Sequence, residues 1–249
     1  MRRSLYRSSL FAALLLLFSC KTQLHHTISG GQYYQIDTLI IADSSIIAYY
    51  APYKKQLEVE MNRVIGYAVR ELPHHRGSES LMGNFFVDAL LWKGKQLDPD
   101  VQVSFATKGG IRAGLKAGNI TVGNTFEIMP FENALSILTL RGTDMLRLAD
   151  YIAETGGQPI GGAKLVIEEK KVKEFLIQDK PIDPNAAYKI ATYDYLANGG
   201  DYVTFFDKLI TRKDYTQRIR ETLMEYISDL TKQGKHIQST LDGRVQIIK

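Results

Sequence analysis

The chain has 249 residues, of which 45% are hydrophobic and 23% are charged. This composition is ordinary for a soluble globular protein, and the chain is long enough to bury a sizeable core without disulfides. The formal net charge is +4, but three arginines lie in the first nineteen residues, and without them the charge falls to +1. No long stripe of lysine and arginine follows, so we expect no binding to nucleic acid, which depends on many phosphate contacts.

The first nineteen residues resemble the signal peptide of a bacterial lipoprotein. A basic start precedes the apolar run Leu10–Phe18, which is too short to span a bilayer comfortably, and Ser19 and Cys20 follow. The resemblance implies cleavage before Cys20, a lipid on its thiol, and export to the periplasmic or surface side of a bacterial membrane. Lys21 gives no aspartate cue for the inner membrane, which favours the outer membrane. An uncleaved anchor helix or a coincidental cysteine is the alternative.

The chain is therefore expected to have three segments. Residues 1–19 are a signal peptide, residues 20–34 a lipidated polar tether, and residues 35–249 one domain. Cys20 is the only cysteine, which excludes disulfides and thiolate metal sites. No internal repeat, low-complexity block or linker divides the rest of the chain.

The first half of the domain is predicted to contain two strands and two helices. β-Branched residues predict a strand at Tyr34–Ala42, and apolar residues at helical spacing predict a helix at Pro52–Leu72. The polar segment Pro73–Ser80 is typical of a loop. A second helix is expected over Gly83–Leu91, and alternating residues predict a strand at Val101–Ala106.

The second half alternates irregularly between strands and helices. A strand is predicted at Ala134–Leu140, followed by a helix that Thr143 caps and Gly156 ends. Further elements are a β-ribbon formed by Lys164–Glu169 and Val172–Ile177, a strand at Tyr188–Tyr195, a helix at Arg218–Leu230 and a strand at Arg244–Lys249. This order favours an α+β fold (mixed α/β), with a mixed sheet and flanking helices around one core.

The segment Thr107–Asn133 carries residues suited to a ligand that is both anionic and aromatic. Gly109 and Gly110 allow positive φ angles and a close approach of a ligand to the backbone. Arg112 follows, and its planar guanidinium suits phosphate or carboxylate. Phe131 follows a proline that fixes the chain entering a turn, so its ring can face a base or a sugar. A nucleotide has both properties.

The roles of three other residues each have two interpretations. Asp201, in a second Gly-Gly turn, either accepts hydrogen bonds from two neighbouring hydroxyls such as a ribose diol or bonds its own backbone. Tyr195, just before that turn, is a core residue or a stacking platform, and its chemistry alone favours the core. Arg76 belongs to a plain surface loop or reaches an anion beside the site.

Four motifs in one order resemble the C-terminal domain of the 5'-nucleotidases. A Gly-Asn near an Asp-Ala pair appears in the helix at Gly83–Ala89, and the Asn-Gly-Gly-Gly-Ile-Arg turn of the family appears as Thr107–Arg112. Its Pro-Phe-Gly-Asn turn appears as Pro130–Asn133, and its Asn-Gly-Gly-Asp-Gly turn as Asn198–Tyr202. The resemblance is collinear from the first predicted strand to the last residue.

In that family the domain binds the nucleoside end of the substrate. The resemblance implies that Phe131 and Tyr195 sandwich the base, which makes stacking the favoured reading of Tyr195. It also implies that Asp201 holds the ribose hydroxyls, that Arg112 lies near the phosphate, and that Asn133 lies near the base. A further arginine of the family precedes the Gly-Asn helix, and Arg76 is close to it but not in register. This residue, Gly109 and Gly110 complete the expected substrate-binding set.

The sequence departs from the family pattern at four positions. Thr107 replaces an asparagine, which is expected to remove or alter a contact linked to phosphate or catalysis. Lys108 replaces the first glycine and is expected to make that turn less permissive. Glu132 adds a negative charge beside the ring, and Tyr202 replaces a glycine after Asp201. These changes affect ligand preference more than ligand class.

The metal-binding motifs of the family are absent from the sequence. Its nucleotidases use an N-terminal domain in which two metal ions activate water and neutralise phosphate charge. None of the five histidines lies in an Asp-x-His or a Gly-Asn-His-Asp/Glu motif, and too few residues separate Cys20 from the first predicted helix to hold that domain. We therefore predict no catalytic residue, metal ion or cofactor in this chain, with divalent metals on a separate metallophosphoesterase subunit.

Three functions are compatible with these observations. The leading hypothesis is the lipid-anchored, nucleotide- or nucleoside-binding half of a 5'-nucleotidase-type phosphohydrolase, acting in nucleotide catabolism. The alternative is a stand-alone nucleoside-binding lipoprotein for scavenging or sensing, without an enzymatic partner. A third is a decayed structural protein that keeps the fold and binds nothing.

Overall fold

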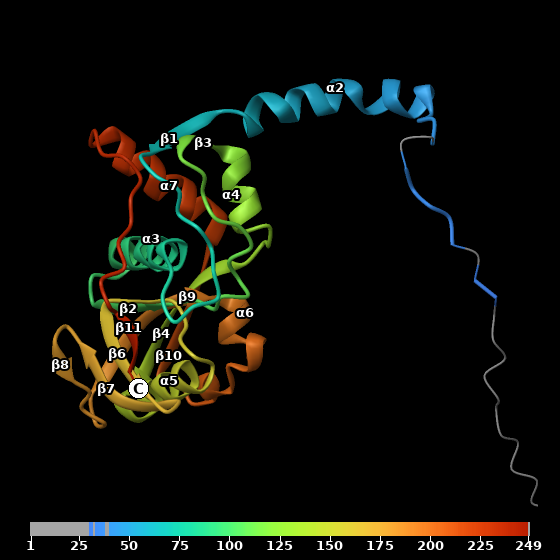
Figure 1. Cartoon of the computed structure of the whole chain (residues 1–249). Helices are drawn as coiled ribbons and strands as arrows, with labels where there is room; N and C mark the ends of the chain where they lie inside the picture. Colours follow the sequence, from blue (N-terminus) through green and yellow to red (C-terminus); the bar gives the residue numbers. More distant parts are fainter. Residues whose placement is uncertain (1–29, 32, 38–39, 249) are drawn as a thin grey trace, which may run out of the picture. The chain divides into compact units, whose positions relative to one another are not determined.

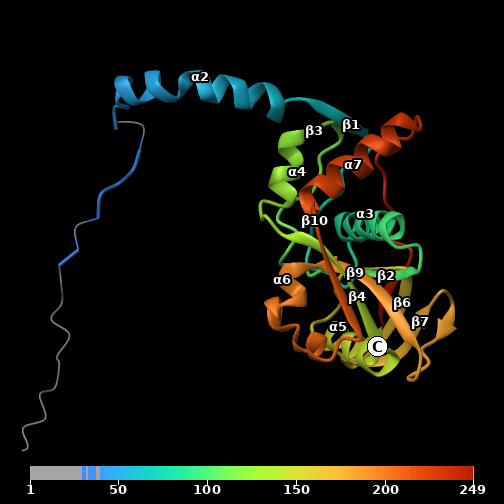
Figure 2. The same cartoon turned by 180° about the vertical axis from the view of Figure 1, so that it is seen from behind.

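The computed structural model describes residues 30–31, 33–37 and 40–248 (Figures 1 and 2). The predicted signal peptide, Cys20 and most of the tether lie outside these residues. The chain divides into two compact units, Met1–Ala48 and Tyr49–Lys249. The second unit contains the sheets described below. Within the described ranges, no helix is both long and apolar enough to cross a membrane.

A five-stranded sheet forms the centre of the second unit. Its order is β10-β4-β9-β2-β5. Strands β2 and β9 are parallel, and the other neighbouring pairs are antiparallel, which confirms the predicted mixed sheet. The strands are β2 (Val101–Phe105), β4 (Ala134–Arg141), β5 (Ile160–Gly161), β9 (Ala187–Tyr193) and β10 (Thr211–Arg218).

Two smaller sheets accompany it. A four-stranded sheet has the order β11-β6-β7-β8, in which β6 and β7 form the predicted ribbon and β11 lies parallel to β6. The third sheet pairs β1 with β3. Their strands are β1 (Val64–Ala68), β3 (Gly118–Thr121), β6 (Ala163–Glu168), β7 (Lys171–Ile177), β8 (Lys180–Pro181) and β11 (Val245–Ile248).

Helices cover the central sheet on both sides. α3 (Leu81–Leu97) and α5 (Gly142–Glu154) lie on opposite sides of it in Figures 1 and 2, and α7 (Ile219–Lys232) packs against α3. Each presents an apolar stripe inward, such as Met145, Leu148 and Ile152 of α5, which are fully buried. Shorter helices are α4 (Val122–Ile128), α6 (Asp194–Ala197), η1 (Gly200–Tyr202) and η2 (Thr204–Asp207).

The predicted start of the domain is wrong in two ways. No strand is found in the described residues 34–37 and 40–42. The helix α2 runs over Ser44–Met61, with Pro52 inside it, so it begins and ends earlier than predicted. The residues Val64–Ala68 leave the helix because they are rich in strand-forming side chains and pair with β3.

Three smaller corrections concern local structure. α5 begins at Gly142, so Thr143 is not its cap, and any Cβ at Gly142 would overlap the carbonyl of Asp183. α4 has only seven residues, too few to show a helical period, and it was not predicted. β10 was also missed because its sequence is mostly polar and exposed, as on many edge strands.

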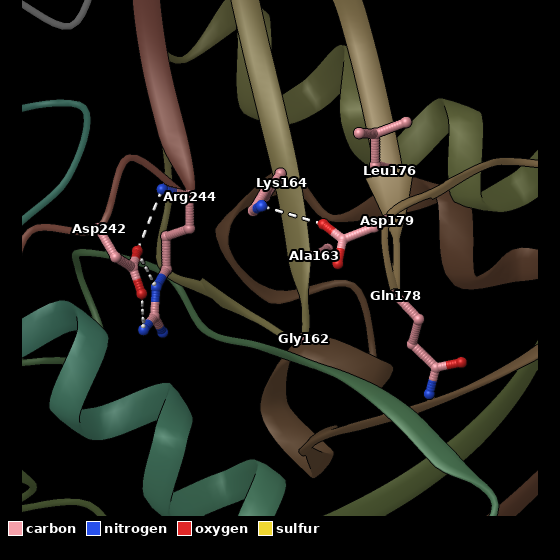
Figure 3. Close-up of a pocket in the computed structure, with 8 residues that line it drawn as sticks. All are labelled: Gly162, Ala163, Lys164, Leu176, Gln178, Asp179, Asp242 and Arg244. Carbon is pink, nitrogen blue, oxygen red and sulfur yellow. Dashed lines mark hydrogen bonds and ion pairs between the residues drawn. The ribbon is translucent and has the colours of Figure 1, made fainter.

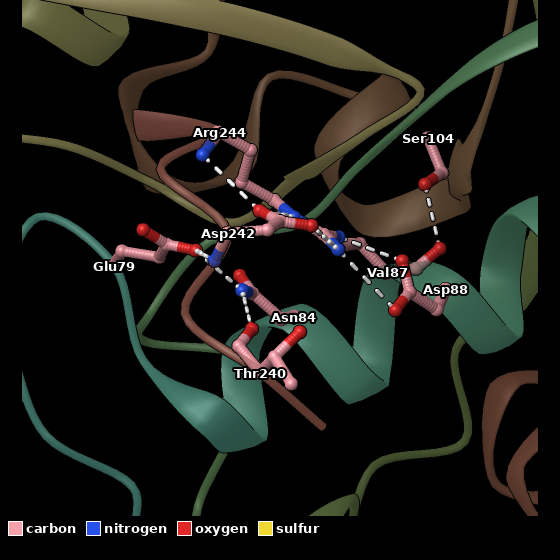
Figure 4. A network of polar contacts seen from close by, with 8 residues as sticks. All are labelled: Glu79, Asn84, Val87, Asp88, Ser104, Thr240, Asp242 and Arg244. Carbon is pink, nitrogen blue, oxygen red and sulfur yellow. Dashed lines mark hydrogen bonds and ion pairs between the residues drawn. The ribbon is translucent and has the colours of Figure 1, made fainter. Parts of the chain in front are cut away.

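A polar network attaches the start of α3 to the segment before β11 (Figure 4). Ser80 is the cap of α3, since its hydroxyl accepts from the amide of Gly83. The Asn84 side chain is instead a structural partner: it donates to the Glu79 carboxylate at 2.6 Å and to the Thr240 carbonyl at 2.8 Å. Buried polar groups need such partners, because an unpaired amide in the core is destabilising.

Arg244 extends the same network to the side of α3. Its side chain is only 13% exposed, and its guanidinium contacts Asp88 at 2.6 Å and Asp242 at 2.7 Å. Figure 3 shows Arg244 and Asp242 at one side of a pocket of about 390 Å³, with Lys164 and Asp179 paired at the other. The charged groups that line this pocket form ion pairs with one another, so we assign them a structural role.

Candidate functional site

Three turns meet at one edge of the central sheet because of strand direction. β2 and β9 are parallel, with Val103 beside Ile190, so both end at the same edge. β4 is antiparallel to β9, with Leu135 beside Tyr193, so β4 begins at that edge. The chain leaving β2, the chain entering β4 and the chain leaving β9 are therefore neighbours. These are the three turns that the sequence motifs marked.

The turns enclose a pocket of about 300 Å³. Its lining residues are Gly109, Gly110, Arg112, Phe131, Asn133, Tyr195 and Asp201. The structure thus brings together seven of the eight residues expected to bind substrate. The eighth, Arg76, is not among the lining residues and lies in the neighbouring exposed loop.

In the first turn, glycine is needed because other side chains lie close to the backbone, and not because the backbone takes unusual dihedral angles. Neither Gly109 nor Gly110 has a positive φ, so the turn does not use the conformational freedom that these glycines allow. A Cβ at Gly110 would overlap the hydroxyl of the buried Tyr193, and one at Gly109 would lie 3.2 Å from the Asp201 carboxylate. Side chains from the end of β9 and from the third turn thus pack directly on the backbone of the first turn.

Arg112 presents its charge to the pocket. The preceding Ile111 is buried and anchors the chain, and the Arg112 amide donates to the Ile128 carbonyl at 2.8 Å. The guanidinium donates to the Gly109 carbonyl at 3.2 Å and lies 5.9 Å from the centre of the Phe131 ring. No acidic side chain in the described part of the chain pairs with it, so its charge is available to an anionic ligand.

More positive charge lies beside Arg112. The Lys108 ammonium donates to the carbonyls of Gly156 at 3.2 Å and Arg76 at 3.3 Å. Lys108 needs no positive φ, so it does not restrict the turn as expected, and its side chain joins three loops. Burial, followed by the charges of Arg76, His75, Arg112 and Lys108, holds the pKa of His74 below its usual value.

The second turn presents Phe131 between two buried anchors. Met129 and Leu135 are fully buried, whereas Phe131 is 41% exposed and faces the pocket. Glu132 forms ion pairs with Arg218 at 2.7 Å and Arg220 at 2.6 Å. Its hydrogen bond with Arg220 lowers the pKa of the Glu132 carboxyl. The negative charge expected beside the ring is therefore compensated by two arginines.

The third turn joins a ring and a carboxylate. Tyr195 is 46% exposed and lines the pocket, so its chemistry alone misplaced it in the core. Its hydroxyl donates to a carboxylate oxygen of Asp201 at 3.2 Å, and the Asp201 amide donates back to the hydroxyl oxygen at 3.3 Å. Gly200 lies against the ring face, where any Cβ would overlap it.

Asp201 is held from three sides in a left-handed conformation. Its other carboxylate oxygen accepts a hydrogen bond from the Thr107 hydroxyl, which gives the residue that replaced the family asparagine a role in positioning. Its carbonyl accepts from the Tyr151 hydroxyl at 2.9 Å. The φ angles are 52° at Asp201 and 62° at Tyr202, which is uncommon for residues other than glycine.

Asp194 is a positioning residue that the sequence did not reveal. Its carboxylate accepts from the Ala134 amide at 3.1 Å and from the Tyr195 amide at 2.7 Å, and so connects the second turn to the third. Its only sequence signal is an aspartate in the first turn of the short helix α6. In the part of the chain that the structure describes, no group of three or more His, Cys, Asp or Glu residues is arranged to hold a metal ion.

The family with the description "5'-nucleotidase, C-terminal domain" matches residues 57–208, which include all three turns. The chain belongs to the 5'-nucleotidase C-terminal domain family. An apyrase of Tabanus yao is 30% identical over 207 residues, covering 70% of this chain and 36% of the apyrase. The cell wall protein Lmo0130 of Listeria monocytogenes is 28% identical over 219 residues, covering 77% of this chain and 28% of that protein.

A solved structure confirms the fold of this family. The 5'-nucleotidase precursor of Thermus thermophilus superposes with a TM-score of 0.71 and 27% identity, over 82% of this chain and 42% of that one. The chain thus spans less than half the length of each of these three proteins. The match alone does not show that this chain shares the activities of those whole proteins.

Proposed function

We propose that this chain is the nucleotide- or nucleoside-binding half of a 5'-nucleotidase-type phosphohydrolase. The observation that carries the proposal is one pocket lined by two half-exposed rings, an arginine without an acidic partner and a positioned carboxylate. The rings of Phe131 and Tyr195 bind a base by stacking. Asp201 accepts hydrogen bonds from the ribose hydroxyls, and Arg112 binds the phosphate. Asn133 lines the same pocket, and its amide is the group that we assign to hydrogen bonding with the base.

The metal chemistry of phosphate release is proposed to come from a separate metallophosphoesterase chain. The pocket does not fit a pair of metal ions, because its lining holds one carboxylate and no histidine. The oxygens of that carboxylate, on Asp201, already accept hydrogen bonds from Thr107 and Tyr195. The metal-ligand motifs of the family are also absent from the 249 residues. This chain accordingly recognises the nucleoside, and its partner cleaves the phosphate.

We further propose export and lipid anchoring at Cys20, on the periplasmic or surface side of a bacterial outer membrane. The apolar run Leu10–Phe18 and the Ser19-Cys20 pair support this. A relative that is a cell wall protein is consistent with a site outside the cytoplasm. Metabolic labelling with a palmitate analogue tests it: wild type incorporates the label, and Cys20→Ala does not.

Two measurements test the binding function. Calorimetric titration of the chain with AMP and adenosine is expected to show saturable binding, and the absence of binding to either would overturn the proposal. Mixing the chain with a metallophosphoesterase encoded beside it is expected to raise AMP hydrolysis. Tight binding of adenosine, with no association with that metallophosphoesterase and no increase in AMP hydrolysis, would instead favour a stand-alone nucleoside-binding lipoprotein.

A further inference from the structure

A buried arginine on α7 contacts the Phe131 turn from behind. Arg220 is the second residue of α7, and its side chain is only 5% exposed. One guanidinium nitrogen donates to the carbonyls of Met129 and Phe131, both at 3.3 Å. The other donates to the Glu132 carboxylate at 2.6 Å. The guanidinium carbon lies 3.9 Å from the centre of the Phe126 ring.

These contacts compensate a buried charge with one short segment of chain. A guanidinium out of water is strongly destabilising unless its donors are paired, and its planar fork fixes the geometry of the pairing. The Met129 carbonyl lies at the C-terminal end of α4, where helix carbonyls lack partners within the helix. The Phe126 face adds a cation–π contact. All the partners of Arg220 therefore lie within residues 126–132.

The backbone of α7 holds the other end of the same turn. The Ile219 amide donates to the Asn133 carbonyl at 2.9 Å. The start of α7 thus fixes the turn at Met129 on one side and at Asn133 on the other. Phe131 lies between these points and is 41% exposed, so the direction of its ring depends on how its backbone is held.

We propose that Arg220 is the positioning residue for base recognition, because it holds the Phe131 turn in the conformation that turns the ring toward the pocket. Glu132, which stands where the family has glycine, completes this attachment. Arg220 does not line the pocket and acts only through Phe131. The inference rests on the proposed function, since it concerns the affinity for the base of the same ligand.

A positioning role and a merely structural role make different predictions. If Arg220 only stabilises the fold, its loss lowers the melting temperature and changes the affinity for all ligands of the pocket alike. If it positions Phe131, its loss weakens ligands that carry a base and leaves ligands without a base unchanged. AMP and ribose 5-phosphate form the matched pair, because ribose 5-phosphate carries a hydroxyl group on the carbon to which AMP attaches its base.

The experiment measures both ligands by calorimetry with wild type, Arg220→Gln, Phe131→Ala and the double variant, each below its melting temperature. Arg220→Gln is expected to weaken AMP about 5- to 150-fold, the range that loss of one stacked ring gives. Ribose 5-phosphate is expected to change less than about twofold. The double variant is expected to bind AMP no more weakly than Phe131→Ala, because residues acting through one contact are not additive.

Arg218→Gln is the control variant. Arg218 also pairs with Glu132, but it is half-exposed and bonds none of the turn carbonyls, so AMP affinity is expected to stay within about twofold. Where Arg220→Gln does not fold, Glu132→Gln removes only the ion pairs and is expected to give the same selective loss at a smaller size.

The outcomes separate the inference from the function beneath it. Wild type that binds neither ligand overturns the proposed function and this inference together. A second outcome is that wild type binds AMP, and Arg220→Gln leaves the affinities for AMP and ribose 5-phosphate unchanged or lowers both equally. That outcome overturns only the positioning role. A double variant that binds AMP more weakly than Phe131→Ala, by the full factor of Arg220→Gln, also overturns it.

Discussion

The hydroxyl of Tyr195 donates to the Asp201 carboxylate at 3.2 Å, and the Asp201 amide donates back to the same hydroxyl at 3.3 Å. This reciprocal pair joins an aromatic ring and an acceptor carboxylate into one unit. Gly200, which separates them in the turn, leaves room for the ring by having no side chain. The distance between the proposed stacking ring and the proposed ribose acceptor is therefore fixed within a single turn of the chain.

Removing either ring is expected to weaken nucleotide binding. Phe131→Ala and Tyr195→Ala should each weaken AMP about 5- to 150-fold, since a stacked base contributes about 1–3 kcal/mol. Calorimetry or intrinsic tyrosine fluorescence measures the change. Tyr202→Ala is the control, because Tyr202 is 89% exposed and does not line the pocket. Equal affinities in all three variants would contradict the stacking role.

Asp201 is expected to recognise the ribose diol. Wild type should prefer adenosine to 2',3'-dideoxyadenosine by about tenfold or more, because a hydrogen bond to a charged group contributes about 1.5–3 kcal/mol. In Asp201→Asn this preference should shrink, while the affinity for the dideoxynucleoside stays similar. Competition titrations of the two nucleosides check it. A preference that survives the substitution would assign the diol to another residue.

Tyr202 occupies a position that favours glycine. Its φ is 62°, and its ring is 89% exposed, so the side chain adds little packing to offset the strained backbone. Tyr202→Gly is expected to stabilise the fold by about 0.5–1 kcal/mol, after the greater freedom of glycine in the unfolded chain is included. Urea unfolding measures this. Tyr202→Ala keeps the strain and should be nearly neutral, and a loss of stability in Tyr202→Gly would refute the explanation.

The Arg244 network is expected to contribute to stability. Arg244→Met leaves Asp88 and Asp242 without their partner, and should lower the free energy of unfolding by about 2–3 kcal/mol. Burial already raises the pKa of Asp88 against the opposing effect of Arg244, so an unpaired Asp88 is unfavourable. Lys164→Met breaks an exposed ion pair in the same pocket and should cost less than about 1 kcal/mol. Similar losses in the free energy of unfolding in both variants would contradict this prediction.

His74 is expected to make the fold less stable in mild acid. Burial and then neighbouring positive charges, Arg76 first among them, hold its folded pKa below the usual value of 6.5, and its Nδ1 atom is buried without a partner. The unfolded chain therefore binds a proton that the folded chain does not, so stability falls as pH drops below about 6.5. Urea unfolding at pH 7.5 and pH 5.5 measures the difference. His74→Asn should reduce it, and an identical difference in both proteins would exclude His74 as its source.

Much of the site could be predicted because its residues lie in short motifs. The Gly-Gly-Ile-Arg, Pro-Phe-x-Asn and Gly-Gly-Asp segments each carry their chemistry within a few residues, and the structure places all of them around one pocket. The strand β4 beside them was also predicted, although its central residues are buried on both faces and do not alternate. Prediction was poorest at residues 62–72, where helical spacing continued although β1 pairs with the distant β3.

The remaining features depend on residues far apart in the chain. Arg220 looks like one more charge on an amphipathic helix, and only the packing of α7 against the Phe131 turn makes it a buried donor. From the sequence, Thr107 is expected to remove a contact. In the structure, the third turn places Asp201 beside its hydroxyl, and the two side chains form a hydrogen bond. The need for glycine at Gly110 likewise comes from the hydroxyl of Tyr193 and not from its own φ.

The order of amino acids establishes which chemical groups this protein has and how its turns follow one another, because those properties are local. Folding establishes which groups meet, how exposed each ring is and which charges are compensated. The physical reason is strand direction: β2 and β9 run parallel, and β4 runs opposite to them, so three separate turns arrive at one edge of the sheet. No single segment contains that information, since it arises only when the strands pair.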